Sequence, residues 1–358
     1  MTTAAQAAYR ADDLVRFARD LFTAAGCDGD KPAIIAELLV AADLLGHTTH
    51  GLQLCAPYLA ELEAGRMTRS GEPAVIADRG ATLTWDGRRL PGVWLTAKAV
   101  DLAVGRARER GLAAVAIRRS HHIACLAAFL ERATVHGMMA VIASSDPNDA
   151  SVAPFGGTRA VFTPDPIAVG IPTDADPILI DISASITTNG LSNRLRKEGR
   201  RYPGAWAMDA LGRATDDPAV LAADPPGTLL PIGGKEYGHK GYGLALMIEA
   251  LTQGLAGFGR ADPAEGWGAG VFVLVLDPEA FAGAQAFRRQ TAWSAAACRD
   301  NPPAPGVERV RLPGEQALAR RQRAEAEGVR LYPGIMESLR PWAEKLGVRP
   351  PRPIQPPA

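Results

Sequence analysis

The sequence has few cysteines, no long apolar run and no excess of charge of either sign. Its four cysteines are widely spaced and form no close pair, which argues against a disulfide framework or a zinc ribbon and favours free thiols in a reducing compartment. No stretch approaches the roughly eighteen uninterrupted apolar residues that a membrane-spanning helix needs. Thirty-nine basic residues balance thirty-nine acidic residues, so no overall field would attract a polyanion. We therefore expect a cytoplasmic protein that binds neither nucleic acid nor membrane.

The chain also lacks the glycine-rich fingerprints of the common nucleotide-binding folds. No Gly-x-Gly-x-x-Gly links a predicted strand to a helix, and the glycine and lysine spacing of residues 233–243 does not fit a Walker A loop. That stretch leads into an apolar run that predicts a helix. Its backbone amides and Lys240 would then lie near a helix N-terminus, where they could bind an anion. A flexible helix lead-in with solvated lysines is the alternative.

The pattern of apolar residues predicts a mixed architecture. At 358 residues, with 47% hydrophobic and 22% charged residues, the chain has the composition of a globular protein of two or three domains or one large α/β body. Helical spacing dominates the first seventy residues and returns at 315–327 and 335–346. Between these parts, helices alternate with short strands and with a hairpin near a turn at 85–87, which predicts a buried sheet covered by helices. The predicted strands include residues 112–117, 138–144, 167–171, 178–182 and 271–276.

Two adjacent histidines, His121 and His122, follow the apolar run 112–117. The chain has only six histidines in all. Histidine can both give and take a proton near neutral pH, so a pair at a strand end is a candidate acid/base site. Residue type alone favours a plainer interpretation, in which one imidazole is solvated and the other is a hydrogen-bonded core residue.

Polar residues gather in other places where loops would follow regular elements. Residues 46–51 form a polar loop between two predicted helices, which could be a ligand-binding loop or a plain connecting turn. Ser145 and Asp146 follow one predicted strand, and Asp181 and Ser183 end another. Such groups suit a nucleotide or a polar substrate at the carboxyl edge of a sheet, although caps and turns use the same residues. Their recurrence at successive strand ends favours a site.

Taken together, these stretches resemble the malate/L-lactate dehydrogenase-like family of NAD(P)-dependent oxidoreductases, which includes ureidoglycolate and sulfolactate dehydrogenases and cyclic-imine reductases. The resemblance extends from about residue 14 to residue 346, with the motifs in the family's order. The family's Gly-x-x-Ser-His-Gly loop is similar to residues 46–51, with threonine in place of serine. Further matches are Pro154-Phe155-Gly156-Gly157, Asp181-Ile182-Ser183, Trp206-Ala207-Met208-Asp209 and Lys240-Gly241-Tyr242-Gly243-Leu244.

The resemblance implies a fold that is α/β (mixed α+β) and non-Rossmann, which accounts for the missing fingerprint. A helical domain would be formed by both chain ends, from residues 8–70 and 310–348. An α/β domain would combine 71–120 with 228–309, and residues 121–227 would form a cofactor-binding α/β domain. The active site would lie between domains in a homodimer. The proline-rich residues 349–358 should form an extended or disordered tail.

The resemblance also assigns roles to single residues. It makes His122 the catalytic acid/base and leaves His121 with no assigned role. Our own mechanistic hypothesis adds two catalytic residues, His50 and Asp146, of which Asp146 would steady charge or tautomer. Thr49, His50 and His122 would hydrogen-bond the substrate. The cofactor, NAD or NADP, would be held by the following residues: Ser145, Asp181, Ile182, Ser183 and Lys240.

One departure from the family pattern concerns the substrate. Many relatives carry an arginine where this chain has Leu54, and an arginine there would clamp a substrate carboxylate bidentately. A small malate-like or lactate-like 2-hydroxy or 2-oxo acid remains the expected substrate. The alternative is a cyclic imino acid, piperideine- or pyrroline-2-carboxylate, which the enzyme would reduce.

Two further classes of function stay open. A metal-dependent hydrolase or aldolase would need a metal bound by a histidine cluster, although the spacing does not require one. Its ligands would be His47, His50, His121 and His122, with Asp146 or Asp181. The loss of the arginine at Leu54 also leaves open a catalytically idle homologue.

Overall fold

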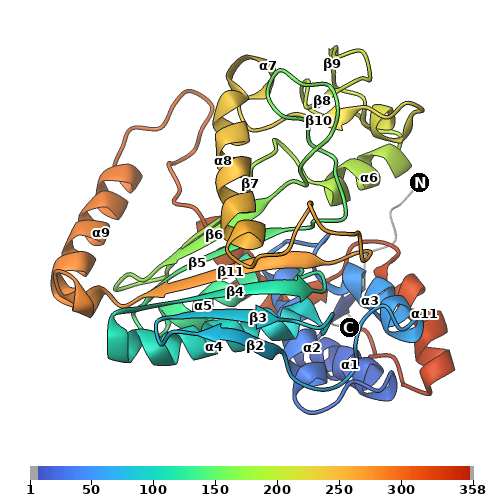
Figure 1. The fold of residues 1–358 in the computed structure, drawn as a ribbon, viewed down its shortest axis with the longest axis horizontal. Helices are drawn as coiled ribbons and strands as arrows, with labels where there is room; N and C mark the ends of the chain where they lie inside the picture. Colours follow the sequence, from blue (N-terminus) through green and yellow to red (C-terminus); the bar gives the residue numbers. More distant parts are fainter. Residues whose placement is uncertain (1–6, 355–358) are drawn as a thin grey trace.

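A seven-stranded mixed sheet forms the centre of the protein, whose computed structural model describes residues 7–354 (Figure 1). Within the described sheet only β3 and β4 pair in parallel, and the other neighbours are antiparallel. The predicted mixed α/β class is thus confirmed, and the sheet differs from the parallel sheet of a Rossmann fold. In spatial order the strands are β2 (Ala74–Asp78), β3 (Thr82–Asp86), β4 (Leu112–Ser120), β11 (Ala269–Leu276), β5 (Met139–Ser145), β6 (Pro166–Ile171) and β7 (Ile178–Ser183).

The middle strands of the sheet are apolar because helices cover both of their faces. Val115, Ile142 and Val273 are fully buried, and branched residues of this kind favour extended backbone. The helices α4 (Gly92–Arg110) and α5 (Ala127–Thr134) pack on one face. The opposite face carries α8 (His239–Glu249) and the π-helical turn η3 (Ala250–Gly254), as Figure 1 shows.

Helices from both ends of the chain pack together beside the sheet. The contacts join α2 to α10 and join α11 to both α1 and α3. The short strands β1 (Ala8–Tyr9) and β12 (Val329–Arg330) pair antiparallel and tie the two ends. The exact domain boundaries remain a prediction. The bounds of these helices are α1 (Ala11–Ala24), α2 (Lys31–Leu44), α3 (Cys55–Glu63), α10 (Glu315–Glu327) and α11 (Ile335–Leu346).

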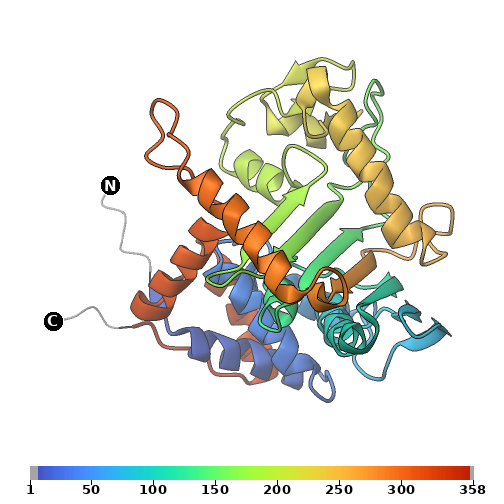
Figure 2. The same ribbon diagram turned by 90° about the vertical axis from the view of Figure 1, so that its left-hand side faces the viewer.

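The remaining elements are mostly short. A small three-stranded sheet lies beyond β7, and α9 runs across the outside of the molecule, where the Trp293 side chain is 71% exposed (Figure 2). No helix within residues 7–354 is long and apolar enough to cross a membrane. These elements are α6 (Asn189–Lys197), β8 (Ala207–Met208), β9 (Ala214–Thr215), β10 (Thr228–Leu229), α7 (Gly234–Tyr237), α9 (Ala284–Arg299) and the 3-10 turns η1 (Leu52–Leu54), η2 (Pro218–Ala222) and η4 (Pro278–Ala280).

The structure corrects the position of the predicted hairpin turn. β2 and β3 do form a hairpin, but its turn is at residues 79–81, where Gly80 has a φ of 83°. Trp85 is inside β3 because its ring is buried when the strand pairs with β4, opposite Ile117. Of the predicted proline-rich tail, residues 349–354 are irregular, and the Ile354 amide donates a hydrogen bond to the Ala8 carbonyl. Residues 355–358 lie outside the described part.

Candidate active site

Three strand ends meet at one edge of the sheet and carry most of the candidate residues. Ser120 at the end of β4 is opposite Ala269, and Ser145 at the end of β5 is opposite Gly270. Because β11 runs antiparallel to both neighbours, its first residues lie beside their last ones. His121, His122, Ser145 and Asp146 are therefore close to the start of β11, as expected for groups that share a sheet edge.

His122 lies in a cage of aromatic rings at this edge. The Tyr58 hydroxyl, from α3, lies 2.7 Å from His122 Nδ1. The His122 ring centroid is 4.8 Å from that of Trp267 and 6.1 Å from that of His50, with which it stacks at an interplanar angle of 26°. Burial lowers the pKa of His122 well below 6.5, and the neighbouring His50 and His121 act in the same direction. The resting imidazole is neutral at physiological pH.

Two hydrogen-bond contacts at Nδ1 define how the His122 ring is protonated. The Ala124 amide, in left-handed backbone with a φ of 61°, donates to Nδ1 over 3.3 Å. A backbone N–H can only donate, so in the resting structure Nδ1 carries the lone pair and Nε2 the proton. The Tyr58 hydroxyl also lies 3.3 Å from the His122 carbonyl oxygen, so it has a second acceptor within reach. Nε2 is consequently the atom available to a substrate.

His50 comes from the polar loop and is positioned by its neighbours. The Thr49 hydroxyl lies 2.8 Å from His50 Nδ1. Burial lowers the pKa of His50 to about 4, and the charges of His47 and Arg194 act in the same direction. The structure therefore brings together Thr49, His50 and His122, which are the three residues expected to bind the substrate.

The polar loop is fixed to α2 by a buried carboxylate. Asp43 accepts a hydrogen bond from the Leu52 amide over 2.7 Å, and a Cβ added at Gly51 would lie 2.4 Å from the Asp43 carboxyl carbon. Only glycine fits at that position. Burial raises the pKa of Asp43 to about 7. The loop conformation that presents His50 thus depends on Asp43.

His121 is the buried member of the histidine pair. Its side chain is fully enclosed, and its Nε2 lies 3.5 Å from a Glu61 carboxylate oxygen. Burial lowers the pKa of His121 to about 4, while Glu61 opposes that shift. The sequence left open which imidazole is internal, and the structure assigns that place to His121 and leaves His122 partly exposed.

Asp146 lies at the same edge but does not contact the His122 ring. Its carboxylate accepts hydrogen bonds from the Asn148 amide over 2.9 Å and the Gly268 amide over 3.3 Å. The groups that contact His122 Nδ1 are the Tyr58 hydroxyl and the Ala124 amide, and not Asp146. Through its hydrogen bond, Asp146 holds Gly268, the residue that follows Trp267.

Ser145 is engaged within the protein. Its hydroxyl donates to Glu249 over 2.7 Å and accepts from the Gln253 amide over 2.8 Å. Glu249 also accepts from Arg260. The Ser145 side chain therefore ties β5 to α8 and η3, and a cofactor contact through its hydroxyl would require one of these partners to move.

The other predicted cofactor residues lie along β7 and α8. Ile182 is 45% exposed, and the Ser183 hydroxyl donates to the Ser185 carbonyl over 2.8 Å. Lys240 is exposed near the start of α8, with its ammonium 5.5 Å from the centre of the Tyr237 ring. A Cβ added at Gly241 would lie 2.5 Å from the Ala184 carbonyl oxygen. The start of α8 therefore passes directly beside the end of β7.

The Asp181 carboxylate, unlike the Ile182 side chain, is directed at other protein groups near the start of α5. It accepts a hydrogen bond from the Ala127 amide over 2.9 Å and lies 3.7 Å from Cys125 Sγ. Potential ligand atoms of His47, Cys125 and Asp181 all lie within 4.8 Å of one another. The four histidines of the proposed metal cluster are thus not gathered as one ligand set, because His47 joins this group while His50 and His122 stack elsewhere.

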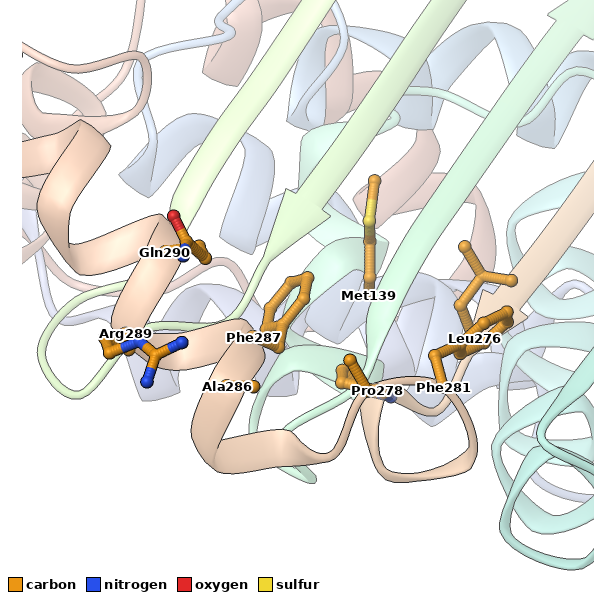
Figure 3. A pocket seen from close by; sticks show the side chains of 9 residues that line it. Met139, Leu276, Pro278, Phe281, Ala286, Phe287, Arg289 and Gln290 are labelled. Atoms are coloured by element: carbon orange, nitrogen blue, oxygen red, sulfur yellow. The ribbon is translucent and has the colours of Figure 1, made fainter.

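A hollow lies at the end of the same strands that is remote from the candidate residues. Its volume is about 470 Å³, and apolar side chains from β5, β11 and the start of α9 line it (Figure 3). Met139 and Leu276, which pair with each other, are at the ends of β5 and β11 remote from the histidines. This hollow brings no acid/base group to the candidate active site.

Three residues of the site were missed in the sequence. Tyr58 had no signal, since His50 lies in the loop before α3 and helical spacing does not relate the two residues. Trp267 had one, because the glycines on both sides of it, just before a predicted strand, allow close approach of the backbone. Arg194 had none, since only the tertiary fold brings α6 to the polar loop.

Comparison with known proteins identifies the relatives of this chain. The family model for malate/L-lactate dehydrogenase matches residues 9–340. The chain belongs to the malate/L-lactate dehydrogenase family. An L-lactate dehydrogenase from Cupriavidus necator is 30% identical over 340 residues, which cover 93% of this chain and 96% of that protein. A (2R)-3-sulfolactate dehydrogenase (NADP(+)) from Chromohalobacter salexigens is 32% identical over 319 residues, covering 87% and 90%.

Two solved structures share the fold. A malate dehydrogenase from Entamoeba histolytica has a TM-score of 0.91 at 22% identity, covering 96% of this chain and 99% of that one. A Δ1-piperideine-2-carboxylate reductase from Pseudomonas syringae has a TM-score of 0.79 at 28% identity, covering 94% and 99%. As a member of the malate/L-lactate dehydrogenase family, the protein is an oxidoreductase that acts on CH–OH groups.

Proposed function

We propose that the enzyme transfers a hydride between NAD or NADP and a small 2-hydroxy or 2-oxo acid, with His122 as the acid/base. The observation that carries this proposal is the placement of His122, whose Nδ1 is held by Tyr58 and Ala124 while its ring stacks on His50. A neutral imidazole with one fixed and one free nitrogen is suited to moving a single proton. The name of the Chromohalobacter relative supports a nicotinamide cofactor.

The proton chemistry follows from the two nitrogens of His122. When bound, the nicotinamide supplies or accepts the hydride at the substrate carbon. In reduction, protonated His122 donates from Nε2 to the developing alkoxide, which accounts for roughly 10²–10⁴-fold in rate. Oxidation needs the other neutral tautomer, in which Nδ1 carries the proton and donates its hydrogen bond to the Tyr58 oxygen over 2.7 Å, so that the lone pair on Nε2 can accept the hydroxyl proton. The Tyr58 hydroxyl hydrogen can turn to the His122 carbonyl, 3.3 Å away.

The residues predicted to hold the cofactor include side chains of the kinds that contact a dinucleotide, namely a cation and an apolar group. β7 is the last strand of the central sheet, so one of its edges faces no further strand of that sheet. Lys240 offers an exposed cation beside that strand end, and exposed Ile182 offers an apolar contact. The side chains of Ser145 and Asp181 face other protein groups, so we assign their cofactor contacts to backbone atoms.

Many relatives have an arginine where this chain has Leu54, and that arginine would bind the substrate carboxylate. Arg194 is our candidate for the cation that takes this role here. Its guanidinium donates to Thr48 over 2.9 Å and to Gln53 over 2.6 Å, and it lies 3.5 Å above the Tyr332 ring. Both hydrogen-bond partners are neutral, and no carboxylate pairs with Arg194 within residues 7–354. Three of its five N–H donors are therefore available to a substrate carboxylate.

A substrate screen tests the proposal. Oxidation of NADH and of NADPH would be followed by fluorescence with 2-oxo acids, cyclic imino acids and uncharged ketones. We expect turnover with a 2-oxo acid and at least one of the two cofactors. No binding of either cofactor, or turnover of uncharged ketones alone, would overturn it.

Reduction of a cyclic imino acid is the second candidate. The Pseudomonas syringae reductase, whose name gives that substrate class, shares the fold and 28% of the aligned residues. The same His122 Nε2 would protonate an imine nitrogen in place of a carbonyl oxygen. The imino-acid arm of the screen separates the two activities. The homodimer and the cytoplasmic location remain predictions, which light scattering and cell fractionation would test.

A further inference from the structure

Three potential metal ligands from separate parts of the chain meet beside β7. His47 lies in the loop after α2, Cys125 follows the histidine pair, and Asp181 belongs to β7. The three ligand atoms all lie within 4.8 Å of one another, and Cys125 Sγ is 3.7 Å from Asp181 Oδ2. In a tetrahedral zinc site, bonds of about 2.3 Å to sulfur and about 2.0 Å to oxygen separate those two atoms by about 3.5 Å. The observed separation nearly matches that value.

The Asp181 carboxylate points independently to a cation. It accepts hydrogen bonds from the Ala127 amide and the Cys125 thiol, and no lysine or arginine pairs with it in the part of the chain from 7 to 354. Carboxylates enclosed by protein are ordinarily paired with a cation or bound to a metal. The group that faces Asp181 is His47, which is itself a ligand type.

We propose that His47, Cys125 and Asp181 form a site for a single thiophilic divalent cation of the zinc type. A set of one nitrogen, one sulfur and one oxygen donor suits Zn²⁺ and excludes Mg²⁺ and Ca²⁺, which prefer oxygen alone. Three protein ligands leave a fourth position for water, reached from the side of the half-exposed His47. Binding forms a metal–sulfur bond, and the thiol proton leaves to solvent.

Occupancy of the site would join the polar loop to β7. His47 is three residues before His50, and the loop between them is held to α2 through Asp43 and Leu52. A bound cation would therefore restrict the loop that presents His50. This inference does not rest on the hydride-transfer proposal, because the ligand geometry is independent of any substrate or nicotinamide.

Cobalt is the probe that reports sulfur ligation directly. Purified protein would be dialysed against a chelator and titrated with Co²⁺, and thiolate-to-cobalt charge transfer would be recorded in the near ultraviolet. We expect one equivalent to produce the band and Zn²⁺ to abolish it by displacement. In Cys125→Ala the band should be lost, whereas Cys298→Ala, which removes an exposed thiol, should retain it.

A second variant keeps the test decisive if Cys125→Ala does not fold. His47→Asn changes a half-exposed residue and should weaken Co²⁺ binding by about tenfold or more, while His239→Asn, at an exposed histidine, should bind as the wild type does. Thermal melting establishes that each variant is folded. A wild-type protein without the charge-transfer band, or a folded Cys125→Ala that keeps it, would overturn the proposal.

Discussion

The Tyr58 hydroxyl lies 2.7 Å from Nδ1 of His122 and 3.3 Å from the carbonyl oxygen of the same residue. Tyr58 is 2% exposed, and burial raises its pKa well above 10, so the phenol stays neutral while it exchanges hydrogen bonds. It can donate to Nδ1, or it can accept from Nδ1 and donate to the carbonyl. Tyr58 is therefore a positioning residue that can serve both protonation states of the His122 ring.

Replacing Tyr58 with phenylalanine tests that role. The variant keeps the ring that packs on Trp267, with centroids 5.5 Å apart, and loses only the hydroxyl. We expect kcat to fall by about 10–100-fold, the equivalent of one hydrogen bond to a group that becomes charged. The pH profile of kcat should also shift. Tyr237→Phe, at an exposed tyrosine, is the matched control. An unchanged rate and pH profile in Tyr58→Phe would show that the Tyr58 hydroxyl does not position His122.

The depressed pKa of His122 predicts opposite pH dependences for the two directions of the reaction. Reduction needs the protonated ring, and its pKa lies well below 6.5, so kcat/KM for reduction should fall about tenfold per pH unit throughout the neutral range. Oxidation needs the neutral ring, so its kcat/KM should be flat there and fall only in acid. Steady-state rates from about pH 5 to about pH 9 measure both. A reduction rate that is constant across that range would show that another group supplies the proton.

Arg194 should determine the affinity for charged substrates. Arg194→Met should raise KM for a 2-oxo acid by about 10–100-fold, because a charge-assisted contact is lost, with little change for an uncharged ketone. Arg196→Met, an exposed arginine on the same helix, should have no such effect. Combining Leu54→Arg with Arg194→Met should restore part of the affinity. Equal losses for charged and uncharged substrates would instead indicate that Arg194 only holds α6 to the loop.

Ionisation of Asp43 should make the difference in stability between the wild-type protein and Asp43→Asn depend on pH. The folded pKa of Asp43 is raised to about 7, whereas the unfolded carboxyl ionises near 4, so the wild-type protein loses stability as pH rises from about 4 to about 7. Asp43→Asn lacks this ionisation. Its free energy of unfolding, relative to wild type, should therefore increase by up to roughly 4 kcal/mol over that range and then level off. Urea unfolding of Asp43→Asn and of the exposed control Asp12→Asn checks the slope. No slope, or one of opposite sign, would refute the assignment.

The strands and helices could be predicted from local pattern because their apolar spacing is strong. The strands that end just before His121 and Asp146 follow from runs such as Val115 to Ile117, which are buried on both faces. The order and direction of the strands could not be predicted. β11 enters the sheet between β4 and β5 from more than a hundred residues later, and no local signal in its own sequence encodes that pairing.

The same distinction applies to the site. His50, His122 and Lys240 could be proposed from motifs, because their chemistry and the resemblance to one family point to the same positions. Their partners required the structure. Tyr58 reaches His122 across 64 residues, and Arg194 reaches Thr48 across 146, so both contacts depend on how the helices pack. Contacts of that kind leave no spacing pattern in the sequence.

The proposed mechanism depends above all on His122 transferring the proton that accompanies hydride transfer. Single-turnover reduction of a 2-oxo acid by His122→Asn, with NADH or NADPH binding followed separately by fluorescence, measures that role. We expect wild-type affinity for the cofactor and a hydride-transfer step slower by about 10²–10⁴-fold. A variant that binds the cofactor normally and transfers hydride at the wild-type rate would contradict it.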